Sequence, residues 1–135
     1  MKIPQRFLLI DDDPFNNRLC QMALKRVFKD PDVISFTEPE TGLDYIENEY
    51  AKNPVDTILF LDLNMPSLTG WEVLEKLEDS NNEIKDHLRI YILSSSIDPV
   101  DKQKADENPI VSGYMEKPLL QAQLQKMFSD NLLNT

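Results

Sequence analysis

Residues 7–14 read FLLIDDDP, an apolar run followed at once by three aspartates and a proline. The apolar part is long enough for one buried strand, and it ends where the charges begin. Three neighbouring carboxylates repel one another, so the acidic run requires an explanation. It is either an acidic turn exposed to water or a site for a cation, and the rest of the sequence must decide between the two.

Further apolar runs of strand length follow along the chain, at residues 33–36, 58–61, 90–93 and 111–115. Between these runs, apolar residues recur at helical spacing, as in the stripe Cys20, Leu24 and Phe28. This alternation predicts an α/β fold, the flavodoxin-like (βα)5 doubly wound parallel sheet with strand order 2-1-3-4-5.

The apolar stripes also predict which side chains enter the core. Met22 and Leu120 fall at core spacing, and Val100 and Ala105 are the only core candidates in the polar segment 98–108. The polar stretch 79–86 is expected to form a loop within the domain.

Composition limits the functions that are open to the chain. It has 135 residues, the size of one domain, with 24 acidic and 14 basic residues and a net charge of −10. No cluster of lysine and arginine is present, so direct binding to nucleic acid is not expected. Cys20 is the only cysteine, which excludes an intramolecular disulfide and a thiolate zinc site. Since no apolar run reaches membrane-spanning length, we expect a cytoplasmic protein without membrane contact.

The acidic residues gather where a site is expected. Sites in open parallel sheets form beyond the carboxyl ends of the strands. Asp13 precedes Pro14 and is expected to cap a helix, which leaves Asp11 and Asp12 beside Asp62 on the neighbouring strand. At roughly 5 Å and an effective dielectric constant of about 20, two such charges repel by about 3 kcal/mol. A cation or a proton must relieve this repulsion, and oxygen ligands favour Mg²⁺.

Two further polar residues follow strands at the same predicted edge. Ser94 and Lys117 could supply a hydrogen bond and a positive charge to a phosphoryl group beside the acids. Taken singly, a serine at a strand end is usually a cap and a lysine there is usually solvated. With both in place, Asp62 is the natural acceptor of a phosphoryl group. A backbone carbonyl of the following loop is a further metal ligand candidate.

These motifs together resemble the receiver domain of two-component response regulators. The resemblance lies in LLIDD (8–12), LFLDLNMP (59–66), YILSSS (91–96) and SGYMEKP (112–118). Each motif alone is modest, but the set of four has the order and spacing of the family and covers nearly the whole chain.

The resemblance implies roles for the acidic residues. Asp62 would accept a phosphoryl group from a phosphohistidine on a sensor histidine kinase or a histidine phosphotransfer protein. Asp12 would bind Mg²⁺ directly and Asp11 chiefly through water, with Asp62 and the backbone carbonyl of Asn64 also in the coordination sphere.

It also implies roles for the other site residues. Ser94 would turn its hydroxyl toward the phosphoryl group, and Lys117 would pair with it. The bond between Lys117 and Pro118 would be cis. Tyr114 would be the aromatic switch that turns inward with Ser94, although the residues alone favour an ordinary half-buried tyrosine on an edge strand.

The sequence further suggests how the signal is passed on. Residues 1–135 are expected to form a single receiver domain without an output domain, which signals through an unidentified downstream protein or acts as a phosphorelay. Such a signalling protein would catalyse only its own phosphorylation and dephosphorylation. Segment 97–108 is short of core residues, and we expect it to be the most mobile part of the fold.

Three other functions are consistent with this fold class. A flavin-binding module would need a phosphate-binding loop where this chain has carboxylates. A phosphohydrolase with an aspartate nucleophile usually carries a second acid two residues later, where Asn64 stands. A receiver-like module that binds partners without phosphorylation is the main alternative.

Overall fold

The computed structural model of the chain describes residues 3–128. Its strands are all parallel and form one sheet in the order β2-β1-β3-β4-β5. They are β1 (Arg6–Ile10), β2 (Val33–Phe36), β3 (Thr57–Leu61), β4 (Leu88–Ser94) and β5 (Val111–Glu116). The predicted strand order is confirmed.

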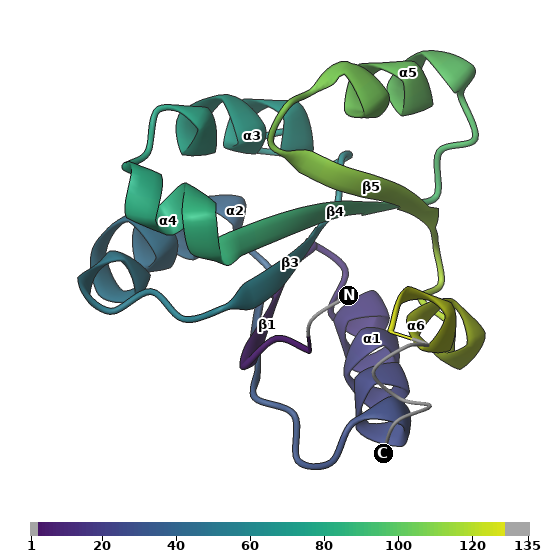
Figure 1. Cartoon of the computed structure of the whole chain (residues 1–135). Helices are drawn as coiled ribbons and strands as arrows, with labels where there is room; N and C mark the ends of the chain where they lie inside the picture. Colours follow the sequence, from purple (N-terminus) through teal and green to yellow (C-terminus); the bar gives the residue numbers. More distant parts are fainter. Residues whose placement is uncertain (1–2, 129–135) are drawn as a thin grey trace.

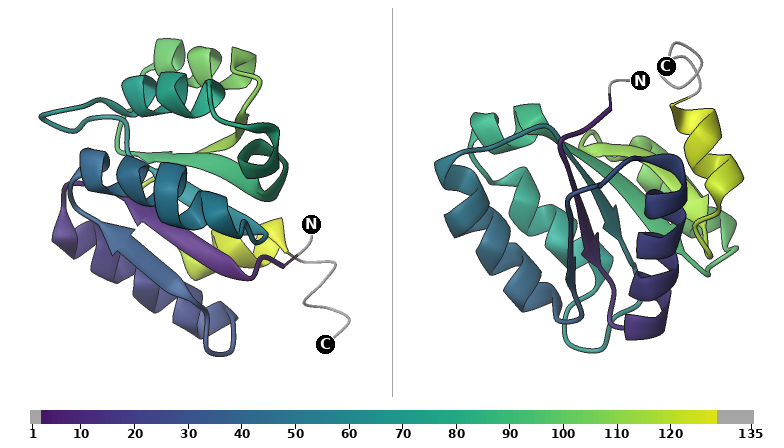
Figure 2. Two further views of the ribbon diagram at one scale, coloured as in Figure 1. Left: turned by 90° about the vertical axis from the view of Figure 1, so that its left-hand side faces the viewer. Right: turned by 90° about the horizontal axis from the view of Figure 1, so that it is seen from below.

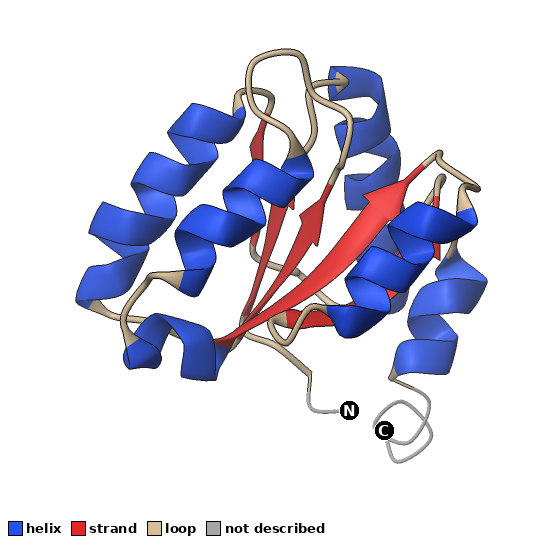
Figure 3. Cartoon of the chain, turned by 90° about the horizontal axis from the view of Figure 1, so that it is seen from above, coloured by secondary structure: helices blue, strands red, loops and turns tan. Residues whose placement is uncertain are grey.

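Helices cover both faces of this sheet (Figures 1 and 3). They are α1 (Pro14–Val27), α2 (Pro39–Asp44), the π-helical continuation η1 (Tyr45–Tyr50), α3 (Gly70–Glu78), α4 (Asn82–His87), α5 (Pro99–Glu107) and α6 (Gln121–Met127). Figure 2 shows α1 and α6 on one side of the sheet and α2 and α3 on the other.

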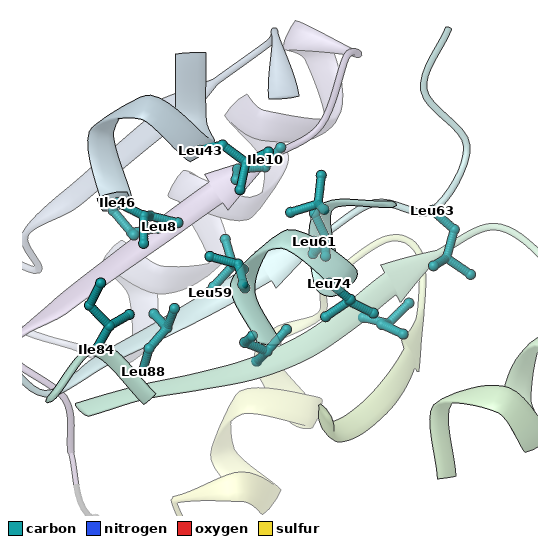
Figure 4. Close-up of a cluster of buried hydrophobic side chains, with 14 of the residues drawn as sticks. Leu8, Ile10, Leu43, Ile46, Leu59, Leu61, Leu63, Leu74, Ile84 and Leu88 are labelled. Atoms are coloured by element: carbon teal, nitrogen blue, oxygen red, sulfur yellow. The ribbon is translucent and has the colours of Figure 1, made fainter. Parts of the chain in front are cut away.

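The alternation of side chains along the central strands divides the core in two. On one face, Leu8 and Leu59 belong to a cluster that α2, η1, α3, α4 and Ala105 of α5 complete, and Figure 4 shows part of it in close-up. On the other face, Phe7 and Phe60 pack with residues of α1 and α6. Because both faces are covered, β3 is buried at every position, as its uninterrupted apolar run predicts.

The prediction of a loop at residues 79–86 is wrong for its second half, because Asn82–His87 forms the short helix α4. The side chain of Asn81 caps this helix by accepting a hydrogen bond from the backbone N–H of Ile84 at 2.9 Å. Ile84 is only 3% exposed and joins the core cluster under α3. This buried side chain and the Asn81 cap, together with the hydrogen bond from Lys85 Nζ to the carbonyl of Glu78 at 3.0 Å, hold the six-residue helix in place.

Three of the predicted core residues are wrong, since Met22, Val100 and Leu120 are exposed. Ala105 is buried as expected, and a residue five positions away on a helix lies about 140° around the axis, so Val100 faces solvent. Met22 lies on the outer side of α1, and Leu120 precedes the first turn of α6.

Candidate functional site

The backbone hydrogen bonds of the sheet continue past the strand ends and fix the residues that follow them. The N–H of Asp62 donates to the carbonyl of Ile10 at 2.9 Å, and the N–H of Lys117 donates to the carbonyl of Ser94 at 2.9 Å. Residues after β1, β3, β4 and β5 are thereby held at one edge of the sheet. The cluster expected from the sequence can form because this register is fixed.

The three aspartates converge as expected. Asp11, Asp12 and Asp62 each offer a carboxylate oxygen within 4.8 Å of the others, and Asp11 and Asp62 are buried while Asp12 is exposed. Lys117 lies between the two buried acids, with its Nζ 2.8 Å from Asp11 Oδ2 and 3.2 Å from Asp62 Oδ1. The ammonium group therefore supplies the positive charge that the paired carboxylates require.

The electrostatics of this group follow from burial and mutual charge. Burial, and then the negative charge of Asp11, raise the pKa of Asp62 from 3.8 to about 6, although Lys117 and the backbone N–H of Asn64 oppose the shift. Burial by itself would lower the pKa of Lys117, but its contacts with Asp11 and Asp62 outweigh burial and raise this pKa. Lys117 therefore remains an ammonium ion at neutral pH.

Asp11 is held by several donors that the sequence analysis did not identify. Its Oδ2 accepts from Asn16 Nδ2 at 2.7 Å, its Oδ1 accepts from the N–H of Asp13 at 2.9 Å, and its carbonyl accepts from Asn17 Nδ2 at 3.1 Å. Both asparagines are buried. A signal for Asn16 was present, because the buried stripe through Cys20 and Leu24 extends back to it by one helical turn.

Asp13 has the local role predicted for it. Its Oδ1 accepts from the N–H of Phe15 at 3.0 Å, and it caps α1 with Pro14 in the first turn. Asp13 is therefore occupied as a helix cap, outside the carboxylate cluster.

Ser94 and Tyr114 meet at a third residue, Ser96. The Oγ of Ser94, which is fully buried, accepts from the N–H of Ser96 at 3.0 Å. The hydroxyl of Tyr114 donates to the carbonyl of Ser96 at 2.8 Å, and the tyrosine ring is half-buried. The peptide bond between Lys117 and Pro118 is cis, as the resemblance implied.

The loop after Asp62 approaches the site closely. A Cβ at Gly70 would meet the carbonyl oxygen of Asp62 and would lie 2.9 Å from Cα of Leu63, so a side chain does not fit there. The N–H of Gly70 donates to the carbonyl of Leu63 at 2.9 Å. Gly70 thus lets the start of α3 close against Asp62 and Leu63.

The donor set fits a hard divalent cation. Carboxylate oxygens from two neighbouring strand ends are hard ligands of the kind that Mg²⁺ prefers. Among residues 3–128, no helix is long and apolar enough to span a membrane.

Comparisons with known proteins agree with this geometry. The family model described as "Response regulator receiver domain" matches residues 7–129. Response regulator Rcp1 of Synechocystis sp. is 28% identical over 95 residues, which are 69% of this chain and 63% of Rcp1. The matched regions span less still of two longer relatives, 23% of a probable cyclic di-GMP phosphodiesterase of Vibrio cholerae and 7% of a hybrid histidine kinase of Dictyostelium discoideum.

Solved structures give the same result. The crystal structure of a two-component response regulator from Cytophaga hutchinsonii has a TM-score of 0.84 and 28% identity, and the match covers 99% of this chain and 100% of that one. The Mn²⁺-bound form of Rcp1 has a TM-score of 0.71 and 27% identity, with 94% and 91% of the two chains covered.

Proposed function

The chain belongs to the response regulator receiver domain family, and on that premise we propose that Asp62 accepts a phosphoryl group from a phosphohistidine of a partner protein. The donor is a sensor histidine kinase or a histidine phosphotransfer protein. The observation that carries this proposal is the contact of Lys117 with both Asp11 and Asp62 at the carboxyl edge of the sheet. A signal then passes to a downstream protein through phosphorylation-dependent contacts, or onward through a phosphorelay.

In the transfer step, a carboxylate oxygen of Asp62 attacks phosphorus. A new O–P bond forms, the P–N bond to the donor imidazole breaks, and its electron pair returns to the imidazole nitrogen. The ammonium of Lys117, 3.2 Å from Asp62 Oδ1, is close enough to pair with a phosphoryl oxygen on the acyl phosphate. The buried hydroxyl of Ser94 supplies a hydrogen-bond donor from the adjacent strand end.

Asp12, Asp62 and the backbone carbonyl of Asn64 would hold Mg²⁺ directly, and Asp11 would act chiefly through water. The hydrogen bonds of Asp11 support this division, because both of its carboxylate oxygens already accept from neighbouring groups. When bound, Mg²⁺ offsets negative charge on the transferring phosphoryl oxygens. Asp12, which is exposed, keeps its carboxylate accessible from solvent.

Hydrolysis of the acyl phosphate by water would return Asp62 to its carboxylate form. The chain would therefore catalyse only its own phosphorylation and dephosphorylation, without turnover of other phosphate compounds. The cytoplasmic location stays a prediction from the sequence.

The test uses the purified chain with Mg²⁺ and phosphoramidate as a small phosphodonor. We expect intact-mass spectrometry to find one added phosphoryl group, which tandem fragmentation assigns to Asp62. The label should disappear in Asp62→Ala and persist in Asp106→Ala, a control that removes an exposed acid from α5. Label that persists in Asp62→Ala would contradict the site, and an unlabelled wild type would favour the phosphorylation-independent binding module.

A further inference from the structure

Ser96 connects the phosphorylation site to β5 and to α5, and the mechanism above does not use it. Its N–H donates to Ser94 Oγ at 3.0 Å, and its carbonyl accepts from the Tyr114 hydroxyl at 2.8 Å. These two backbone groups flank the same Cα. When the Ser94 hydroxyl moves toward a phosphoryl group, the N–H of Ser96 loses its acceptor or moves with it. A change in the Ser96 backbone also moves its carbonyl, which holds the Tyr114 hydroxyl.

The side chain of Ser96 is tied to the first turn of α5. Its hydroxyl donates to Asp101 Oδ2 at 2.9 Å and accepts from the N–H of Asp98 at 3.2 Å. A hydrogen bond from a hydroxyl to a carboxylate is stronger than one between neutral groups. Asp98 also caps α5 by accepting from the N–H of Val100 at 3.0 Å, so the loop and the helix start form one hydrogen-bonded unit.

The rest of α5 has little else to hold it in place. Ala105 is its only buried residue, and Lys104 lies over the ring of Trp71 with its Nζ 4.5 Å from the ring centre. The contact between Ser96 and Asp101 is thus one of the few side-chain contacts that attach the start of α5 to the loop after β4.

There is also room for a second position of Tyr114. A hollow of about 270 Å³ lies beside its ring, between the start of α5 and the end of β5, with Ile97, Lys102 and Glu116 in its lining. If the bond to the Ser96 carbonyl is lost, the ring has space on this side to move.

We propose that Asp101 is a positioning residue that, by holding the Ser96 hydroxyl, fixes the backbone of Ser96 between Ser94 and Tyr114 and ties it to the start of α5. The proposal rests on the proposed function for its signal, which is phosphorylation of Asp62. The hydrogen bonds that join Ser94, Ser96, Tyr114 and Asp101 are present in the unphosphorylated chain. Without Asp101, events at Ser94 still reach the Ser96 backbone, but they reach α5 only through the longer contact between the Asp98 N–H and the Ser96 hydroxyl.

The experiment compares wild type with Asp101→Ala, Ser96→Ala, the double variant and Asp101→Asn, which keeps an acceptor oxygen. Asp106→Ala serves as the matched control, because it removes an exposed acid from the same helix without touching Ser96. Two-dimensional NMR follows the Tyr114 ring and the amides of residues 96–102, before and after phosphorylation by phosphoramidate with Mg²⁺. Intact mass measures the phosphorylated fraction of every sample.

In unphosphorylated Asp101→Ala, we expect the Tyr114 ring signals to shift and amide exchange in residues 97–101 to accelerate roughly tenfold, the equilibrium effect of losing one charge-assisted hydrogen bond. On phosphorylation, the shifts at Ser94 and Ser96 should remain, while those in α5 should fall below half of the wild-type values. Asp101→Asn should recover much of the response, and the double variant should match Asp101→Ala.

Unchanged Tyr114 signals and a wild-type response of α5 in Asp101→Ala would overturn the proposal, as would the same change in Asp106→Ala. These outcomes are distinct from a failure of the proposed function. If no sample gains a phosphoryl group by mass, the comparison of the unphosphorylated variants still decides whether Asp101 holds Tyr114.

Discussion

Lys117 both stabilises the buried acids of the site and supplies a positive charge for the proposed chemistry. Asp11 and Asp62 are each 4% exposed and would repel strongly without the ammonium group between them. Removing one member of a buried charged group leaves the others unpaired, which costs more than the intact arrangement contributes. The same ammonium is the positive charge that an incoming phosphoryl group needs.

We therefore expect Lys117→Met to lower the free energy of unfolding by about 3 kcal/mol in the presence of a chelator at neutral pH. Phosphorylation by phosphoramidate should also fall sharply. Chemical denaturation measures the first effect and intact mass the second. Lys126→Met, an exposed lysine of α6, is the control and should change neither. A Lys117→Met variant as stable as wild type would mean that the acids are not held at the spacing described.

Cys20 provides a pH-dependent test of burial. Burial, followed by the charge of Asp11, raises the pKa of its thiol from 9.0 to about 12. A raised pKa in the folded state means that the stabilisation is complete below pH 9 and is lost between pH 9 and 12, because the unfolded thiol ionises first.

Between pH 8 and pH 10, the free energy of unfolding of wild type should fall by about 1.4 kcal/mol more than that of Cys20→Ala. Denaturant titrations at the two pH values measure how far the free energy of unfolding changes with pH in each protein. The difference between the two changes is independent of the cavity that alanine leaves. In the folded protein at pH 8, iodoacetamide should leave this cysteine unmodified. Equal pH slopes for the two proteins would contradict the buried position of Cys20.

The elements α3 and α5 have the same length but different attachment. Each has nine residues, yet α3 buries Val73, Leu74 and Leu77 besides Gly70, while α5 buries Ala105 alone. Local opening requires less free energy where fewer apolar contacts must be broken.

Hydrogen exchange followed by mass spectrometry should therefore find the fastest exchange of any helix in segment 97–108, with α5 at least roughly tenfold faster than α3. The comparison of two helices of equal length removes the effect of length itself. Protection of α5 as strong as that of α3 would show that the contacts with Trp71 and Ser96 hold the helix by themselves.

The elements that the sequence predicted correctly are those with a long periodic pattern. The central strands β1 and β3 have continuous apolar runs, and α1 has a stripe of several turns, so hydrophobic burial determines both. Helix α4 was not predicted because a six-residue helix with one buried residue, Ile84, produces no periodic pattern in the sequence. Its stability comes from a side-chain cap and a tertiary contact, which only the folded chain reveals.

The site as a whole was predictable for a topological reason. In a parallel sheet, the residues that follow the strands must share one edge, so Asp11, Asp62 and Lys117 could be assigned to one cluster before any distance was known. The supporting hydrogen bonds were not predictable in this way. The helical stripe indicated that Asn16 faces the core, but the partner of its side chain depends on packing. The same holds for the partner of Asp101, which lies on a largely exposed helix.

Because the candidate metal ligands come from two strand ends and the loop between β3 and α3, cation binding is coupled to folding of the whole molecule. A ligand that binds only the folded state raises the free energy of unfolding, by about 2.7 kcal/mol at roughly 100 times its dissociation constant. We expect Mg²⁺ to raise the melting temperature of wild type, and EDTA to reverse the shift. The rise should be larger in Lys117→Met, where the ion relieves the repulsion between Asp11 and Asp62 in place of the missing ammonium group.

Two variants make this last expectation specific. Asp12→Ala removes an exposed ligand without opening the core, so it should abolish the Mg²⁺-dependent shift without lowering the melting temperature in EDTA. Asp106→Ala should keep the full shift, and NaCl at matched ionic strength should separate site binding from general screening of the net charge of −10. A shift of equal size in Asp12→Ala and wild type would place the ion elsewhere on the acidic surface, and Lys117 would then supply the positive charge beside the carboxylates after β1 and β3.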